Sequence, residues 1–168
     1  ETIQNKAHVC SVLYTWQGGI EAGNASADVL TGAVTPSGKL PDTIAYDIAD
    51  YPSTENFGDE ERNYYAEDIY VGYRYFETFA PEKVQFPFGF GLSYTEFQTQ
   101  VTRAKVQGEG KEAVAVIEAC VTNTGAVYSG KEVVQVYYEA PQGKLGQPVR
   151  QLAAFQKTGL LAPEKARS

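Results

Sequence analysis

The 168-residue chain is long enough for one ordinary domain or two small ones, and its 43% hydrophobic and 21% charged residues are typical of globular proteins. The net charge of -7 argues against a nucleic-acid partner, because a phosphate backbone would be repelled. No apolar run approaches the roughly 20 residues that cross a bilayer. The composition is compatible with a folded protein that acts on a neutral substrate.

The N-terminal part has the pattern of an α/β unit. Residues 8–16 form a short apolar run rich in β-forming residues, which predicts a buried strand. After a pair of glycines, Glu21–Leu30 predicts a helix with small residues for close packing and Gly32 as its C-cap. We therefore expect residues 1–50 to be the end of a larger α/β domain.

Cysteine and histidine usage gives no support for a metal or redox site. The two cysteines, Cys10 and Cys120, lie far apart without CxxC spacing, and we expect both to be buried free thiols. His8 is the only histidine and has no second ligand at metal-binding spacing. The sequence therefore predicts no metal and no cofactor.

Residues 51–95 are interpreted as a connecting segment. The chain from Thr35 to Glu61 is a long polar stretch with several prolines and glycines, which suits a functional loop or a plain linker. Aromatic and β-branched residues dominate Asp68–Phe76, which predicts a strand. Glycines then alternate with aromatic residues in Pro87–Tyr94, a composition that disfavours a helix.

Residues 96–168 have an all-β pattern. Four strands are predicted, at 97–106, 113–122, 132–139 and 149–158, each followed by turn-forming residues. Along the second strand, the more apolar face is expected to point to the core, and it carries Ala115, Ile117, Ala119 and Val121. Four strands are fewer than the roughly seven of an immunoglobulin-like sandwich, so we expect an incomplete domain and a chain truncated at both ends.

Three blocks, in order, carry a resemblance to a known family. They are Trp16–Gly32 with Pro36–Pro41, then Tyr65–Phe76, and last Phe86–Thr95, which reads FPFGFGLSYT. The first resembles W-x-G-G-x-E-x-G-N-A-x-A-D-V-L-x-G followed by P-S-G-K-L-P in family 3 glycoside hydrolases. The third resembles that family's entry into a fibronectin type III-like domain. The resemblance implies an α/β segment followed by a mostly-β, immunoglobulin-like (fibronectin type III-like) sandwich.

The same resemblance implies a β-glucosidase-like hydrolase of carbohydrate metabolism, a retaining exo-β-glycosidase. Such enzymes use an Asp nucleophile from a barrel domain and a Glu acid/base from the α/β sandwich domain. In the usual domain order both precede the position of Trp16, so we assign no catalytic residue and expect this fragment to be inactive alone. Some relatives carry the barrel after the fibronectin-like domain, and the sequence of this fragment leaves both orders open. The expected partners are a carbohydrate substrate and the barrel domain of the same protein. No signal peptide is visible, which leaves a cytoplasmic or a secreted location open.

Three residues are candidates for contact with substrate. Trp16 lies at the C-terminal end of the predicted strand, where its indole stacks on a sugar ring or packs in the core. Glu21 lies at a helix start, where accepting backbone N–H bonds is the structural alternative to a sugar contact. Asn56 lies in the polar stretch 53–65, which we expect to border a cleft. The adjacent acids Glu67 and Asp68 are rejected as a catalytic pair, because neighbours in a strand point to opposite faces.

The alternative hypothesis for the function is a noncatalytic fibronectin-like binding or spacer module. The β-rich half alone would allow it. The strand, glycine turn and helix of the first block have no place in a free sandwich module and favour the enzyme.

Overall fold

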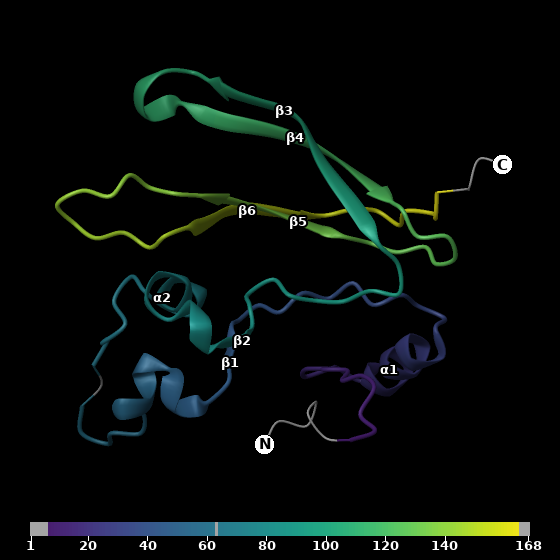
Figure 1. The fold of residues 1–168 in the computed structure, drawn as a ribbon, viewed down its shortest axis with the longest axis horizontal. Coiled ribbons are helices and arrows are strands. Elements are labelled where there is room, and N and C mark those ends of the chain that lie inside the picture. The colour runs from purple at the N-terminus through teal and green to yellow at the C-terminus, as the bar shows by residue number, and fades with distance from the viewer. Residues whose placement is uncertain (1–6, 63, 165–168) are drawn as a thin grey trace. The chain divides into compact units, whose positions relative to one another are not determined.

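The computed structural model describes residues 7–62 and 64–164, and the chain divides into two compact units, Glu1–Thr35 and Pro36–Ser168 (Figure 1). Among its described residues, 7–35, the first unit contains one helix, α1 (Ala22–Thr31). Gly32 ends it in the left-handed conformation at φ 78°, and its N–H donates to the Val29 carbonyl over 3.1 Å. A glycine adopts this conformation without the steric cost of a Cβ, and both the helix and its predicted cap are confirmed.

The strand predicted at residues 8–16 is wrong. These residues have no regular secondary structure, and Val12 and Trp16 are 58% and 61% exposed. A strand needs a neighbour to accept and donate its backbone hydrogen bonds, and no described segment pairs with this one. For the same reason Cys10 is exposed and not buried.

The second unit begins with a small α/β cluster. Strand β1 (Ile44–Ala45) pairs antiparallel with β2 (Val84–Phe86). Between them lie the 3-10 turns η2 (Ile48–Asp50), η3 (Pro52–Glu55) and η4 (Pro81–Lys83), and the helix α2 (Tyr73–Phe79). The cluster's buried centre is Ala45, Phe76 and Ala80, against which Tyr51, Tyr75 and Val84 pack.

Helix α2 replaces the predicted strand at 68–76, and that prediction is wrong. Residues 66–69 form a turn, and Gly72 precedes the helix at φ 61°. Phe76 and Ala80, four positions apart, are 1% and 4% exposed and therefore share one buried face. This tertiary packing outweighs the β-propensity of the tyrosines, isoleucine and valine in the segment.

Two antiparallel hairpins follow the cluster in the second unit. Strand β3 (Phe97–Gln107) pairs with β4 (Val114–Asn123), with the 3-10 turn η5 (Gly110–Glu112) between them. Strand β5 (Val133–Tyr138) pairs with β6 (Gln151–Lys157). The four predicted strands are therefore confirmed, and they form separate two-stranded sheets.

The predicted core face of the second strand is wrong in this chain. Ala115 and Ala119 are exposed, and Ile117 is 43% exposed. Cys120, predicted to be buried, is exposed as well. The alternation of apolar residues marks a face that a second sheet layer would cover, and no described segment covers it.

Lys39 joins its own motif block to the block at 86–95 and to Glu132, which directly precedes β5. Its ammonium donates to the Gly91 carbonyl over 2.9 Å and pairs with the Glu132 carboxylate at 2.9 Å, where both side chains are 18% exposed. The backbone of Leu40 adds two 2.8 Å hydrogen bonds, accepting from Gly89 and donating to Phe90. The junction fastens the β5–β6 hairpin to the α/β cluster.

Asn123, at the end of β4, is a second point of attachment. The residue is 2% exposed. Its amide nitrogen donates to the carbonyls of Tyr128 and Leu161 over 2.8 and 3.0 Å, and its amide oxygen accepts from the Thr95 hydroxyl and the Gly125 N–H over 2.6 and 3.1 Å. One side chain therefore ties β4 to the segment before β3 and to the chain after β6.

Candidate functional site

A cavity of about 420 Å³ lies in the segment between η3 and α2. This volume is within the usual range of small-ligand sites. Its lining mixes aromatic rings with amide, carboxylate and guanidinium groups, and comprises Ser53, Asn56, Phe57, Gly58, Asp59, Arg62, Tyr64, Tyr65, Glu67, Asp68 and Val71. Every lining residue belongs to the second unit.

Local hydrogen bonds shape the loop that surrounds the cavity. The amide of Asn56 donates to the Tyr64 carbonyl over 2.8 Å and so joins the two ends of the loop. One carboxylate oxygen of Asp59 accepts from the N–H groups of Glu61 and Arg62 over 2.9 and 3.0 Å. The Arg62 guanidinium donates to the Tyr64 hydroxyl over 3.3 Å. These contacts are typical of turns ordered by their own side chains.

Exposed aromatic rings give the cavity surfaces on which a flat apolar ligand face can pack. Phe57 and Tyr65 are 89% and 88% exposed, and Tyr64 is 54% exposed. Exposed rings beside hydrogen-bonding groups are suited to a sugar, which presents apolar C–H faces and hydroxyls at its edge.

The candidate residues of the sequence take different places. Asn56 lines the cavity. Trp16 and Glu21 belong to the first unit. Trp16 has a φ of 55° and packs edge to face on Tyr14 at 5.1 Å. Glu21 precedes α1 without a side-chain bond to the helix backbone, and its carboxylate accepts from the Asn24 amide over 2.5 Å, so the predicted backbone capping is wrong.

The expectation that Glu67 and Asp68 point to opposite faces of a strand is also wrong, because these residues lie in a turn and not in a strand. Asp68 has a φ of 48°, and both side chains line the cavity. Nothing in this arrangement assigns either carboxylate a catalytic role. Their chemistry is that of hydrogen-bond acceptors at the cavity wall.

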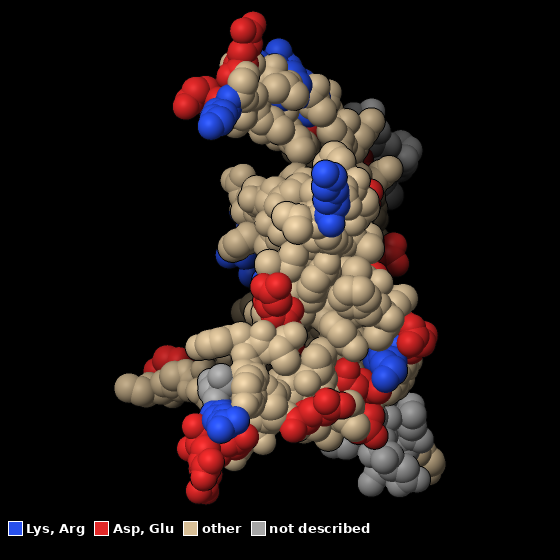
Figure 2. Space-filling view, turned by 90° about the vertical axis from the view of Figure 1, so that its left-hand side faces the viewer, with Lys and Arg blue, Asp and Glu red and all other residues tan. Residues whose placement is uncertain are grey.

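Acidic side chains gather over the lower part of the face in Figure 2, the side on which residues 46–70 lie. In that stretch Arg62 is the basic residue, among acids that include Asp59, Glu67 and Asp68. Such a surface repels anions and accepts neutral hydroxylated ligands. Close by, a 2.8 Å ion pair joins Asp50 to Lys83, and the hydrogen bond from Lys83 to Asp50 raises the pKa of the lysine.

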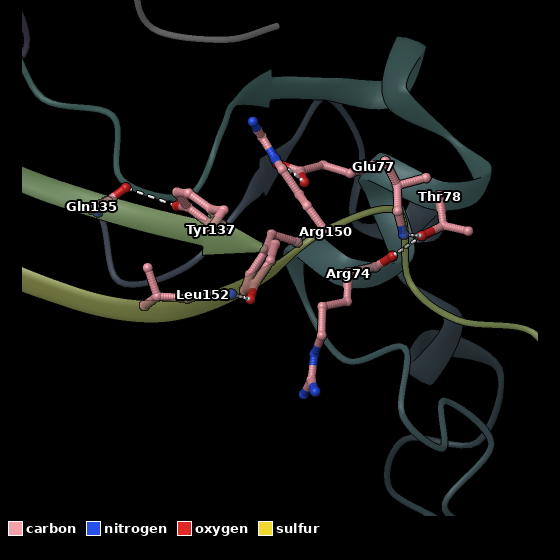
Figure 3. A network of polar contacts seen from close by, with 9 residues as sticks. Arg74, Glu77, Thr78, Gln135, Tyr137, Arg150 and Leu152 are labelled. Carbon is pink, nitrogen blue, oxygen red and sulfur yellow. Dashed lines mark hydrogen bonds and ion pairs between the residues drawn. The ribbon is translucent and has the colours of Figure 1, made fainter. Parts of the chain in front are cut away.

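A polar network between α2 and the β5–β6 hairpin was not foreseen from the sequence (Figure 3). The Arg150 guanidinium donates two 2.6 Å hydrogen bonds to the Glu77 carboxylate, and its carbon lies 4.9 Å from the centre of the Tyr137 ring. Hydrogen bonding to Glu77 raises the pKa of Arg150, and burial raises the pKa of Tyr137. Glu77 and Arg150 are 73 positions apart, so no local pattern could have joined them.

The described residues contain no group of His, Cys, Asp and Glu side chains that could hold a metal ion. In the same part of the chain, no helix has the length and apolar character needed to cross a membrane.

Comparisons with known proteins give two family matches. The model of the glycosyl hydrolase family 3 C-terminal domain matches residues 1–94, and that of a fibronectin type III-like domain matches residues 132–168. A β-glucosidase of Ruminococcus albus is 54% identical over 155 residues, covering 92% of this chain and 16% of that protein. A β-glucosidase of Kluyveromyces marxianus is 44% identical over 156 residues, covering 92% of this chain and 18% of that protein.

Solved structures show the same similarity. A β-glucosidase from Paenibacillus barengoltzii superposes with a TM-score of 0.87 and 65% identity over 89% of this chain and 16% of its own. β-Glucosidase 3B from Thermotoga neapolitana, in complex with glucose, gives a TM-score of 0.76 and 45% identity over 89% of this chain and 21% of its own. The chain thus spans about a fifth or less of the proteins it matches.

Proposed function

Because this chain belongs to glycoside hydrolase family 3, with an α/β segment followed by a fibronectin type III-like sandwich, we propose that it is part of a retaining exo-β-glycosidase. The whole protein removes terminal sugars, glucose first among them, from oligosaccharides or glycosides. Its Asp nucleophile and Glu acid/base lie outside this chain, the former on a barrel domain of the same protein. We divide the chain into residues 1–50, 51–95 and 96–168.

The observation that carries this proposal is the match to β-glucosidases from several organisms over 92% of the chain, including the segments on both sides of the cavity. A free fibronectin-like spacer module, the alternative, is disfavoured because the family 3 match extends over residues 1–94. The chemistry of the cavity also favours a sugar, since its lining combines aromatic rings with amide, carboxylate and guanidinium groups that can hydrogen-bond hydroxyls.

Within the whole enzyme, Asn56, Trp16 and Glu21 are the residues of this chain that we propose to contact substrate. Asn56 has the best geometric support, because it lines the cavity and its amide holds the loop closed. Trp16 offers an indole that is 61% exposed. Glu21 offers a carboxylate able to accept from sugar hydroxyls.

Hydrolysis of an aryl β-glucoside tests the proposed activity. The full-length protein should release the aryl group with retention at the anomeric carbon, and the purified 168-residue chain should release none. Turnover by the chain alone would show that the catalytic carboxylates lie within it. A full-length protein inactive on β-glucosides, β-xylosides and α-arabinofuranosides would refute the glycosidase assignment.

Asn56→Ala in the full-length enzyme tests the cavity. Loss of one hydrogen-bonding side chain at a sugar contact should raise KM several-fold, because a single hydrogen bond contributes about 0.5–1.5 kcal/mol. Thr102→Ala is the matched control, since Thr102 is exposed on β3 and its hydroxyl donates to the Glu118 carbonyl over 3.1 Å, outside the cavity lining. Equal KM values for both variants, on every sugar tried, would remove Asn56 from the substrate contacts.

A further inference from the structure

One face of α2 is occupied by the end of the β5–β6 hairpin. Tyr73 and Glu77 lie one helical turn apart, and Thr78 follows Glu77. The Tyr73 hydroxyl accepts from the Leu152 N–H over 2.8 Å, and the Thr78 hydroxyl accepts from the Val149 N–H over 3.1 Å. Together with the paired hydrogen bonds between Arg150 and Glu77, three residues of one short segment are therefore bound to a single helix face (Figure 3).

Aromatic packing adds directionality to this contact. The Arg150 guanidinium lies 4.9 Å from the Tyr137 ring centre, and the Tyr137 hydroxyl donates to the Gln135 side chain over 2.7 Å. The Tyr73 ring meets Tyr137 edge to face at 6.1 Å. The Arg150 side chain is 45% exposed, so solvent screens its charge, and the fixed bidentate geometry gives the pair its specificity.

The same hairpin loop also reaches the residues that lead from the cavity into α2. A Cβ on Gly146 would lie 2.9 Å from the Tyr70 hydroxyl, so the loop backbone passes directly over that side chain. Tyr70 packs on Phe79 of α2 at a ring distance of 4.8 Å. Val71, the next residue, lines the cavity, and Gly72 begins the turn into the helix.

We propose that the loop between β5 and β6 holds the wall of the cavity in place, with Arg150 as a positioning residue acting through Glu77 and α2. The fibronectin-like part of the chain thereby sets how tightly the cavity binds a saccharide, although none of its described residues lines the cavity. This rests on the proposed function, because it takes a sugar to be the ligand of the cavity.

The test compares Arg150→Ala with Arg103→Ala in the full-length protein. Arg103 is the matched control, because it forms an exposed ion pair with Glu118 at 3.5 Å on the β3–β4 hairpin, away from the cavity lining. Amide hydrogen exchange over residues 64–72 should become at least tenfold faster in Arg150→Ala alone. KM for an aryl β-glucoside should rise threefold or more, with kcat within twofold of the wild type.

The double variant Glu77→Arg with Arg150→Glu exchanges the two charges. It should return the exchange rate over 64–72 and the KM most of the way to the wild-type values. If Arg150→Ala acted by destabilising another part of the protein, the exchanged pair would not reverse its effects. Unchanged exchange over 64–72 in Arg150→Ala overturns the proposal, and so does faster exchange with an unchanged KM. A wild-type protein that cleaves no glycoside refutes the proposed function instead, and the exchange experiment then still decides whether the loop holds the cavity wall.

Discussion

Removing the Asn123 side chain should release the chain around the end of β4. The side chain is 2% exposed and makes four hydrogen bonds, to Tyr128, Leu161, Thr95 and Gly125. Each net hydrogen bond contributes about 0.5–1.5 kcal/mol, and the partners regain some water after Asn123→Ala. We therefore expect local opening to become easier by about 3 kcal/mol, which corresponds to faster amide exchange on the order of 100-fold.

The assay is amide hydrogen exchange of the full-length protein, followed in peptides that cover residues 120–131 and 158–164. Asn123→Asp keeps an oxygen that can accept from Thr95 and Gly125, but it loses the amide N–H groups that donate to the carbonyls of Tyr128 and Leu161. Exchange in the 158–164 peptide should therefore become as fast as in Asn123→Ala. Asn24→Ala, on the exposed side of α1, should leave both peptides unchanged. Exchange in Asn123→Ala within twofold of the wild type would refute the reasoning.

Two further predictions concern the junction and the polar network. Gly91→Ala should lower the melting temperature, because its Cβ would lie 2.1 Å from the Gly38 carbonyl oxygen and overpacking costs about 1–3 kcal/mol, whereas Gly143→Ala, with nothing within 4 Å, should not. Burial raises the pKa of Tyr137 in the folded protein above 10.0, the value of an exposed tyrosine. The protonated hydroxyl therefore contributes stability that is fully present below about pH 10. This contribution is lost as the pH rises through the folded-state pKa. The melting temperature of Tyr137→Phe should therefore fall less steeply above pH 10, and equal slopes would contradict this.

Local patterns in the sequence predicted the elements that depend on local information. The hairpin strands follow from alternation and turn residues, and the end of α1 follows from Gly32. The segment 68–76 was mispredicted because its residues favour strands, while the helix is selected by the burial of Phe76 against distant partners. The predicted burial of Cys10 and Cys120 failed for a related reason, since no described segment covers their faces.

The candidate site was predicted in part. The polar stretch 53–65 was singled out, and most of the cavity lining comes from it. The contribution of Glu67 and Asp68 was missed because the strand assumption sent their side chains to opposite faces, whereas the turn brings both to the cavity. Arg150 and its contacts on α2 could not be found, because contacts between residues so far apart leave no periodic signal in one sequence.

The junction at Lys39 sets limits on exchanging parts between relatives. A chimera cut at residue 95 would keep Lys39 and Gly91 from one parent and take Glu132 from the other. A grafted fibronectin-like module can therefore form this junction only when the recipient already has a lysine at the position of Lys39 and a glycine at that of Gly91. The practical unit of exchange begins at Pro36, ahead of the lysine, and not at the boundary between the two family models.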